Sequence, residues 1–228
     1  MAAYDAICFD LDSTLCESTQ DPSALLESTC DRVGVDPFCT TDDLRDAVPA
    51  LPTAETDREF YELLFAEVAS RVDRELPADV PPALADAYLE ASDPTAVRFR
   101  PGAKAAFELA RDRGPVGLIT NGGRPTQTRK LEALGIADAF DVAVFTDPAA
   151  GIHPKPDTVP FERALSALEV DPADAVHVGD SIHADVAGAN AMGMDSAWVD
   201  HGHEPHLTHE PTYELTSLEE FESIVSPW

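Results

Sequence analysis

Two aspartates follow an apolar segment near the start of the chain. The segment CFDLDSTLCE occupies positions 8–17 and carries Asp10 and Asp12. Burying an unpaired carboxylate is costly, so a strand that ends in two acids needs a partner for them. Residues two apart in an extended chain point to the same side. The spacing therefore indicates one site to which both carboxylates contribute.

Further polar residues occur where later apolar segments end. They are Thr120, Asn121 and Gly122 in LITNGG, Lys155 in HPKPD, and Asp180 and Asp185 in GDSIHADV. Lys155 is one of only three lysines in the chain. The ligands of an open parallel sheet bind beyond the carboxyl ends of its strands. If the apolar segments are parallel strands, these side chains meet at one edge of the sheet.

The elements that would position these residues alternate between strands and helices. Strands are predicted at 4–10, in PVGLITNGG, and at 141–145, 174–180 and 196–199. A helical pattern follows the second, third and fourth of these strands. Such alternation indicates right-handed crossovers and a parallel sheet. The sequence therefore predicts an α/β fold.

Residues 16–95 interrupt the alternation, because their patterns are helical throughout. An Asp-Pro pair begins DPSALLESTCDRVGV, and Thr53 or Thr56 can cap the next helix. The apolar residues of that helix recur at helical spacing: Phe60, Leu63, Leu64, Val68 and Val72. We predict an inserted all-α domain at 16–95 and a core of 1–15 and 96–228. The apolar stripe is expected to form its core, with Phe60, Tyr61 and Phe65 as candidates for lining a pocket.

A divalent cation would resolve the crowding of acids. Four carboxylates at close range repel one another, which raises their pKa values. Mg²⁺ takes oxygen ligands and favours sites that it shares with phosphate. We therefore expect Mg²⁺ among the acids, with Lys155 beside it.

The residue types also predict phosphoryl transfer. A carboxylate is ionised at neutral pH, so Asp10 can attack phosphorus without a general base. The second acid, Asp12, can protonate the leaving oxygen and later take a proton from water. Thr120 and backbone N–H groups near Asn121 and Gly122 would hold the phosphoryl oxygens, since glycine lets the backbone approach closely.

These segments resemble the motifs of the haloacid dehalogenase superfamily of phosphohydrolases. FDLDSTL is similar to its first motif, LITNGG to its second, KPD to its third and VGDSIHADVAGANAMGM to its fourth. All four occur in the family's order and cover nearly the whole core. The resemblance implies a Rossmann-like, doubly wound parallel sheet with a helical cap inserted between the first two motifs.

The resemblance also implies individual roles. Asp10 would be the nucleophile that forms an aspartyl-phosphate, and Asp12 the general acid/base. Mg²⁺ would be held by Asp10, the backbone carbonyl of Asp12 and Asp180. Asp185 would support the metal or its waters, although a first-turn acid favoured by the helix dipole is an alternative reading of it.

The second and third motifs supply the expected phosphoryl site. Thr120 and Lys155 would bind the phosphoryl group, and Lys155 would also orient Asp10. The chain departs from the family at Ser13, where many members carry Gly, and at Thr158, where Pro often follows KPD. Neither departure is expected to touch the chemistry.

The composition is strongly acidic. Among 228 residues, 15 Lys and Arg face 43 Asp and Glu, which gives a net charge of −28. Such a surface repels nucleic acid and anionic lipid. Because the acids are scattered along the chain, we favour adaptation to a salty cytoplasm over an ordinary acidic protein. The four cysteines are expected to be reduced, and neither a signal peptide nor a membrane span is predicted.

The segment HGHEPHLTHE at 201–210 holds four histidines. A transition-metal site is conceivable there, but the spacing fits no helix-borne ligand set, so a solvated loop is the preferred reading. It follows the final predicted strand, which would place it at the rim of the site.

The sequence therefore predicts a cytoplasmic Mg²⁺-dependent phosphatase that acts on a small phosphorylated metabolite. A phosphomutase on the same scaffold, a metal-independent 2-haloacid dehalogenase and a non-catalytic binding protein are the alternatives. The physiological substrate and the oligomeric state stay open.

Overall fold

A six-stranded sheet forms the centre of the larger unit, with strand order β5-β4-β1-β6-β7-β8. The computed structural model describes residues 4–72, 74–202 and 209–225. All five strand pairings in this sheet are parallel. The strands are β1 (Ala6–Phe9), β4 (Val116–Gly123), β5 (Val142–Thr146), β6 (Ala175–Gly179), β7 (Asp195–Val199) and β8 (Tyr213–Leu215). The predicted α/β fold with a parallel sheet is confirmed.

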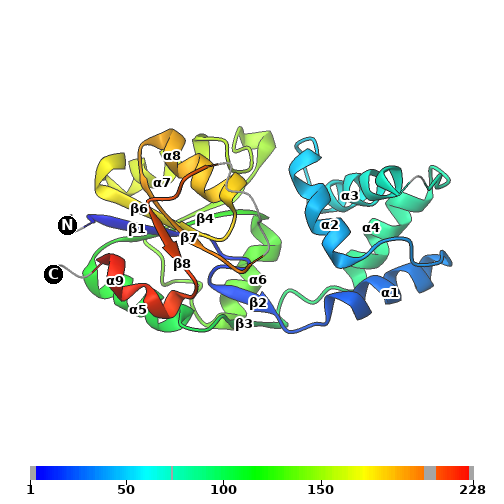
Figure 1. Ribbon diagram of the computed structural model, residues 1–228, viewed down its shortest axis with the longest axis horizontal. Coiled ribbons are helices and arrows are strands. Elements are labelled where there is room, and N and C mark those ends of the chain that lie inside the picture. The colour runs from blue at the N-terminus through cyan, green and yellow to red at the C-terminus, as the bar shows by residue number, and fades with distance from the viewer. Residues whose placement is uncertain (1–3, 73, 203–208, 226–228) are drawn as a thin grey trace. The chain divides into compact units, whose positions relative to one another are not determined.

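Helices cover both faces of this sheet (Figure 1). They are α5 (Ala103–Arg113), α6 (Arg124–Leu134), α7 (Val159–Leu168), α8 (Ala187–Met192) and α9 (Glu222–Val225). Successive residues of a strand point to opposite faces. Thus Phe9 packs in a cluster with residues of α5 and α9, whereas Cys8 packs with residues of α7 and α8. The core is therefore doubly wound, and its central strands are apolar on both sides, as parallel strands require.

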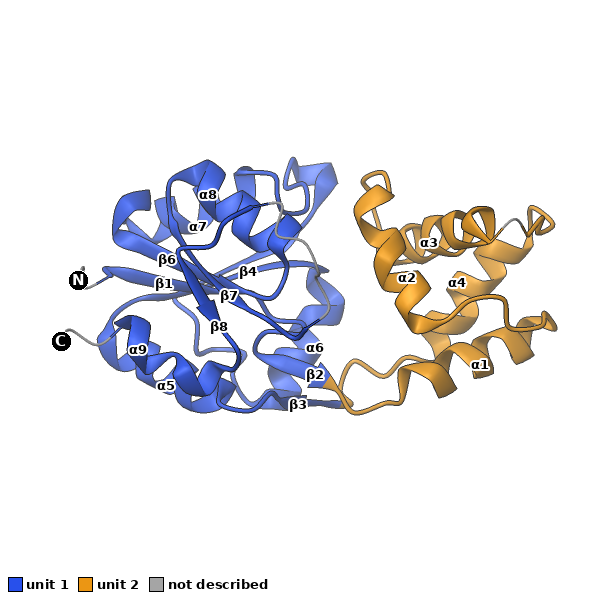
Figure 2. Cartoon of the chain, viewed as in Figure 1, with its two compact units in different colours: residues 1–17, 97–228 blue, residues 18–96 orange. Residues whose placement is uncertain are grey.

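A second compact unit comprises residues 18–96, and the first comprises residues 1–17 and 97–228 (Figure 2). The second contains α1 (Pro22–Val33), α2 (Thr41–Ala47), α3 (Asp57–Arg71) and α4 (Val80–Ala91). Two short strands, β2 (Cys16–Ser18) and β3 (Val97–Phe99), pair where the chain passes between the units. Within the described ranges, no helix is both long and apolar enough to cross a membrane.

The helix starts in this second unit follow from capping residues. The Asp21 side chain accepts the N–H of Ala24 at the start of α1, and the Thr56 side chain accepts the N–H of Glu59 at the start of α3. Of the predicted α3 stripe, Leu64 and Val68 are buried. Val72 is 41% exposed, because α3 ends at Arg71 and Val72 is its C-cap.

Several short elements differ from the sequence prediction. The first strand is β1 at Ala6–Phe9 rather than 4–10, and β8 was not predicted. The helix after β6 begins as a π-helical turn at Ile182–Val186 before α8. Strands of three residues are too short to show a period of two, and a π-helical turn has no sequence period of its own.

The acidic surface predicts a dependence of stability on salt. The ion pairs that the structure shows on the helices of the second unit, such as Arg45–Asp42 within α2 and Arg58–Asp86 between α3 and α4, are solvent-exposed and contribute little each. With 43 acidic and 15 basic side chains, one-to-one pairing leaves most acids without a basic partner. Counterions then have to screen the repulsion.

We therefore expect molar KCl to raise the thermal midpoint relative to millimolar KCl. Each kcal/mol of added stability corresponds to about 2–4 °C in a protein of this size. Differential scanning calorimetry measures the shift, and sorbitol at matched osmolality controls for general exclusion of a cosolute. An unchanged midpoint would refute salt adaptation.

Candidate active site

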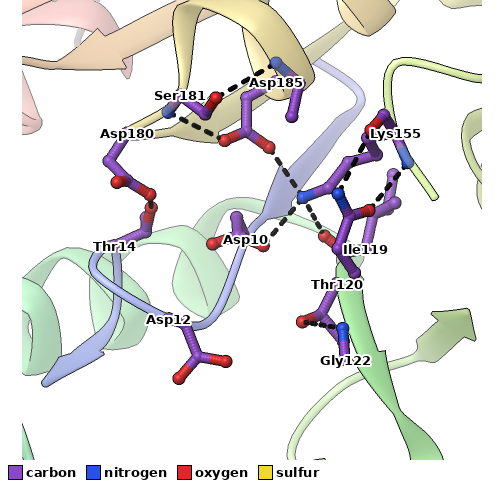
Figure 3. Close-up of polar contacts among 12 residues, drawn as sticks. Asp10, Asp12, Thr14, Ile119, Thr120, Gly122, Lys155, Asp180, Ser181 and Asp185 are labelled. Carbon is purple, nitrogen blue, oxygen red and sulfur yellow. Dashed lines mark hydrogen bonds and ion pairs between the residues drawn. The ribbon is translucent and has the colours of Figure 1, made fainter. Parts of the chain in front are cut away.

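Three of the four predicted acids converge at the carboxyl ends of β1 and β6 (Figure 3). Asp10 follows β1, Asp180 follows β6, and Asp185 lies in the π-helical turn. Each offers a carboxylate oxygen, and these oxygens lie within 4.8 Å of one another. Asp12 is exposed, and its carboxylate points away from that of Asp10 in this view. The sheet topology thus brings Asp10 together with two acids that are 170 or more residues further along the chain.

Lys155 neutralises two of these acids. Its Nζ donates to Asp10 Oδ1 at 2.7 Å, to Asp185 Oδ1 at 2.6 Å and to the carbonyl oxygen of Ile119 at 2.6 Å. Lys155 is 4% exposed. An ammonium group has three hydrogens to donate, so these three contacts use all of them. Any contact of Lys155 with a phosphoryl oxygen has to share or replace one of these bonds.

The side chain of Asn121 holds the backbone of Lys155. Asn121 Oδ1 accepts the Lys155 N–H at 2.7 Å, and Asn121 Nδ2 donates to the Lys155 carbonyl at 3.1 Å. The two bonds fix the segment from which the lysine side chain enters the core. Asn121 was expected near the phosphoryl group, and its side chain is used here to connect the second and third motifs.

We expect Asn121→Ala to lower both stability and activity. It removes two hydrogen bonds, each worth about 0.5–1.5 kcal/mol. The free energy of unfolding in urea and kcat measure the loss. Asn190→Ala is the matched control, because Asn190 on α8 also makes two side-chain hydrogen bonds, to Glu210 and Ser196. If the Asn121 variant lost no more activity than the Asn190 variant, the two hydrogen bonds of Asn121 to the Lys155 backbone would not be needed to position the lysine.

Of the three converging acids, Asp185 has the most hydrogen-bond partners. Besides Lys155, its Oδ1 contacts His177 Nε2 at 2.8 Å, and its Oδ2 accepts the Ser181 N–H at 3.1 Å. Gly179 makes room for it, since a Cβ at position 179 would lie 2.2 Å from the Asp185 Cγ. Asp185 therefore bonds the N–H of Ser181, the N-cap of its own turn, as well as the lysine.

The pKa values of the three converging acids are shifted in opposite directions. Burial raises the pKa of Asp10 to about 7, against the lowering effect of Lys155. Burial, with the charges of Asp10 and Asp185, also raises the pKa of Asp180 well above its usual value. For Asp185, Lys155 and the His177 hydrogen bond outweigh burial and hold its pKa below the usual range. Burial and the neighbouring carboxylates therefore disfavour the ionised forms of Asp10 and Asp180.

The pKa values of the two basic residues beside these acids, Lys155 and His177, are also shifted in opposite directions. Burial alone would lower the pKa of Lys155, but Asp10 and Asp185 outweigh it and raise that pKa above its ordinary value. Burial lowers the pKa of His177. A neutral His177 donates from Nε2 to the Asp185 carboxylate, which can only accept. Among the described residues, the group of three carboxylates thus contacts one lysine, Lys155.

The three carboxylates fit a hard divalent cation. Carboxylate oxygens are the ligands that Mg²⁺ prefers. Burial and the neighbouring carboxylates raise the pKa values of Asp10 and Asp180, so a cation between them would favour their ionised forms. Asp180 is held in place by Thr14 Oγ1, which donates to its Oδ1 at 3.1 Å, and by Trp198 Nε1, which donates to its carbonyl. Asp10 and Asp180 are the residues with oxygens least used by protein donors.

Thr120 and Asp12 lie against α6. Thr120 is 3% exposed at the end of the apolar part of β4, and its Oγ1 accepts Gln127 Nε2 at 2.8 Å. The same Nε2 donates to Asp12 Oδ2 at 2.7 Å, and Lys130 Nζ contacts both Asp12 oxygens at 2.6 and 2.8 Å. Gly122 adjoins this group, because a Cβ there would lie 2.2 Å from Gln127 Nε2.

The histidine-rich segment falls largely outside the described residues, which omit 203–208. His201 is described, and its Nε2 lies 2.7 Å from the Ser13 carbonyl while its Nδ1 lies 3.2 Å from Arg100. A carbonyl can only accept, so Nε2 carries the hydrogen. Ser13 adopts φ +62°, a left-handed conformation in which glycine is favoured. His201 thus contacts the turn that follows Asp12.

Sequence reasoning missed four residues of this site: Thr14, Gln127, Lys130 and His177. The sequence contains a signal for Lys130 with Gln127, and another for His177. Lys130 is one of three lysines and lies three residues after Gln127, so both share a helix face. His177 interrupts an apolar strand three residues before Asp180. The contacts of Thr14 depend on the turn after β1, which no pattern encodes.

Comparisons with known proteins agree with this architecture. Residues 4–193 match the model of the haloacid dehalogenase-like hydrolases. A predicted phosphoglycolate phosphatase from Haemophilus somnus, solved by crystallography, superposes with a TM-score of 0.80 over 99% of this chain and 100% of its own, at 19% identity. That likeness supports the fold.

The curated relatives that match in sequence include a pyrophosphatase and a sugar-bisphosphate phosphatase. The pyrophosphatase PpaX of Bacillus velezensis is 36% identical over 113 residues, 49% of this chain and 51% of its own length. The ribulose-1,5-bisphosphate 5-phosphatase of Halopiger xanaduensis is 34% identical over 143 residues, 62% of this chain and 59% of its own. The matched region thus spans between half and three fifths of these relatives.

Proposed function

The chain belongs to the haloacid dehalogenase-like hydrolase family, and from this membership we propose that it is a Mg²⁺-dependent phosphatase of small phosphorylated metabolites. The observation that carries the proposal is the ion-paired group of Asp10, Lys155 and Asp185, with Asp180 beside it and Thr120 on the neighbouring strand. A carboxylate nucleophile, a neutralising cation and a metal-binding acid are what phosphoryl transfer to an aspartate requires.

In the first step, a carboxylate oxygen of Asp10 attacks phosphorus. The bond from phosphorus to the leaving oxygen breaks, and that oxygen takes its electron pair together with a proton from the carboxylic acid of Asp12. The Thr120 hydroxyl and the backbone N–H groups near Gly122 hold the phosphoryl oxygens. Asp10 then carries the phosphoryl group as an acyl phosphate.

In the second step, the Asp12 carboxylate takes a proton from water as the water oxygen attacks phosphorus. The bond between phosphorus and Asp10 breaks, which releases inorganic phosphate and restores the Asp10 carboxylate. Lys155 offsets the charge of Asp10 throughout, because its Nζ stays within hydrogen-bonding distance. Both steps need Asp12 to reach the oxygen on the far side of phosphorus from Asp10.

The residues that would hold Mg²⁺ are Asp10 and Asp180, with the Asp12 carbonyl and with Asp185 supporting them. When bound, Mg²⁺ supplies positive charge that lowers the repulsion between a phosphate dianion and the carboxylates. Residues 18–96 are proposed as the cap that selects the substrate, which favours small metabolites over phosphoproteins.

Two rival activities on the same scaffold are less well supported. A metal-independent 2-haloacid dehalogenase needs neither Asp12 nor an acid such as Asp180 beside its nucleophile, yet both are present with defined partners. A phosphomutase has to shield its phosphoenzyme from water and bind a sugar phosphate in two orientations. Release of inorganic phosphate, rather than isomerised substrate, separates a phosphatase from a mutase.

The test is a screen of phosphorylated metabolites in high KCl with Mg²⁺, with EDTA as the metal-removal arm. We expect phosphate release from one or a few small phosphate monoesters, which EDTA abolishes and added Mg²⁺ restores. The assay follows inorganic phosphate, and chloride release from 2-chloropropionate runs in parallel. Halide release without Mg²⁺, or no Mg²⁺-dependent turnover across the panel, would refute the proposal.

A further inference from the structure

The Asp12 carboxylate is held from one side by two residues of α6. Lys130 Nζ contacts both of its oxygens at 2.6 and 2.8 Å, and Gln127 Nε2 donates to Oδ2 at 2.7 Å. Gln127 is 1% exposed, and the Lys130 side chain is 17% exposed. The two residues are three apart on a helix, so they share a face. Asp12 is therefore fixed by partners that are themselves packed against the core.

The orientation of the Gln127 amide follows from its partners. A carboxylate can only accept hydrogen bonds, so the amide atom that faces Asp12 is Nε2. The second hydrogen of Nε2 then goes to Thr120 Oγ1, which lies 2.8 Å away. Thr120 Oγ1 also accepts the Gly122 N–H at 3.4 Å. Because the hydroxyl receives these bonds, its own hydrogen is directed elsewhere and can be donated to a phosphoryl oxygen.

The direction of the Asp12 side chain suits its part in an in-line displacement. The attacking and leaving oxygens lie on opposite sides of phosphorus. An acid that protonates the leaving oxygen therefore has to point away from the nucleophile and leave room for the phosphoryl group. The Asp12 carboxylate points away from Asp10 in this way (Figure 3).

We propose that Gln127 and Lys130 are positioning residues, which hold Asp12 on the leaving-group side and turn the Thr120 hydroxyl toward the phosphoryl group. The inference rests on the proposed phosphatase function and names the residues through which two of its catalytic groups are aligned. Lys130 acts through Asp12 alone, whereas Gln127 connects Asp12 to Thr120.

A double-mutant cycle tests this directly. In the wild-type background, Lys130→Met lowers kcat for p-nitrophenyl phosphate about 10- to 100-fold, part of what general acid–base catalysis contributes. In the Asp12→Asn background, the same substitution changes kcat by no more than about twofold, because the side chain that Lys130 positions can no longer donate or take a proton. KM stays within about threefold in both backgrounds, and Lys130→Arg, which keeps the charge, recovers part of kcat.

The leaving group gives a second readout that a general loss of folding does not produce. An alkyl phosphate needs protonation of its leaving oxygen far more than p-nitrophenyl phosphate does, so Lys130→Met lowers kcat/KM more for ethyl phosphate. Lys104→Met is the matched control, since Lys104 lies on α5 and its side chain is 67% exposed. It is expected to leave both substrates unaffected.

Equal losses from Lys130→Met in the two backgrounds, or a loss confined to KM, would overturn the inference, because Lys130 would then act without Asp12. Gln127→Met extends the test. This substitution should still lower kcat in the Asp12→Asn background, because Gln127 also donates a hydrogen bond to Thr120. Absence of Mg²⁺-dependent hydrolysis by the wild-type protein would instead refute the proposed function, and the inference with it.

Discussion

Asp10→Asn abolishes phosphate release, with kcat lowered by about 10⁴-fold or more, as expected when a covalent nucleophile is removed. The amide keeps the shape of the side chain, and its oxygen can still accept a hydrogen bond from Lys155 Nζ, 2.7 Å from Asp10 Oδ1. It has no anionic oxygen to attack phosphorus. The variant is expected to fold, because it removes one of three crowded carboxylates.

Trapping the phosphoenzyme gives the decisive measurement. Wild-type protein quenched in acid during turnover should carry a phosphoryl group that hydroxylamine removes, as an acyl phosphate requires. The Asp10→Asn variant should carry none. Asp138→Asn is the control, since Asp138 is exposed in the same unit and should leave both the phosphoenzyme and kcat unaltered. Wild-type turnover by the Asp10 variant would rule out the mechanism.

The fold could be predicted because its signals are local and periodic. Apolar segments such as 141–145 and 175–179 are long enough to be recognised between helical patterns, and their alternation predicts a parallel sheet. The order of the strands in the sheet could not be predicted. That β1 lies between β4 and β6 depends on packing between distant segments. Short elements such as β8 carry no period and could not be predicted.

The convergence of Asp10, Asp180 and Asp185 could be predicted because each follows the end of a strand within a few residues, and the ends of parallel strands meet at one edge. The ion pairs and hydrogen bonds that these acids make could not be predicted. The sequence places Lys155 near Asp10, but its three donors depend on how the loop after β5 enters the core. Asp12 illustrates the same limit. Its spacing from Asp10 predicts a shared side, yet its shortest side-chain contacts are with Gln127 and Lys130 on α6, which the motif does not contain.

Lys155 should matter for stability as much as for activity. Lys155→Met keeps the aliphatic stem but leaves Asp10 and Asp185 buried without the ammonium group that contacts both. Removing one partner of a buried ion pair costs about 3–5 kcal/mol, because it leaves an uncompensated charge. Urea unfolding in EDTA measures this loss, and kcat should fall on the order of 10³-fold because Asp10 is no longer neutralised.

The pH dependence of that loss identifies its cause. In the wild type, Lys155 holds the pKa of Asp185 below the unfolded value near 3.9, so Asp185 contributes stability at neutral pH that is lost only as pH falls through its low folded pKa. Without the ammonium, burial raises that pKa instead. The variant then loses stability as pH rises above about 4, and its deficit should be larger at pH 8 than at pH 5.

Two further substitutions separate charge from packing. Lys155→Arg keeps the charge but cannot place one atom within reach of three oxygens, so it should recover part of the stability and little of kcat. Lys104→Met controls for the loss of any lysine, since the 67% exposed side chain of Lys104 should change unfolding by less than about 0.5 kcal/mol. If Lys155→Met were as stable as that control in EDTA at pH 8, the lysine would not be compensating the acids, and the electrostatic account of the site would fail.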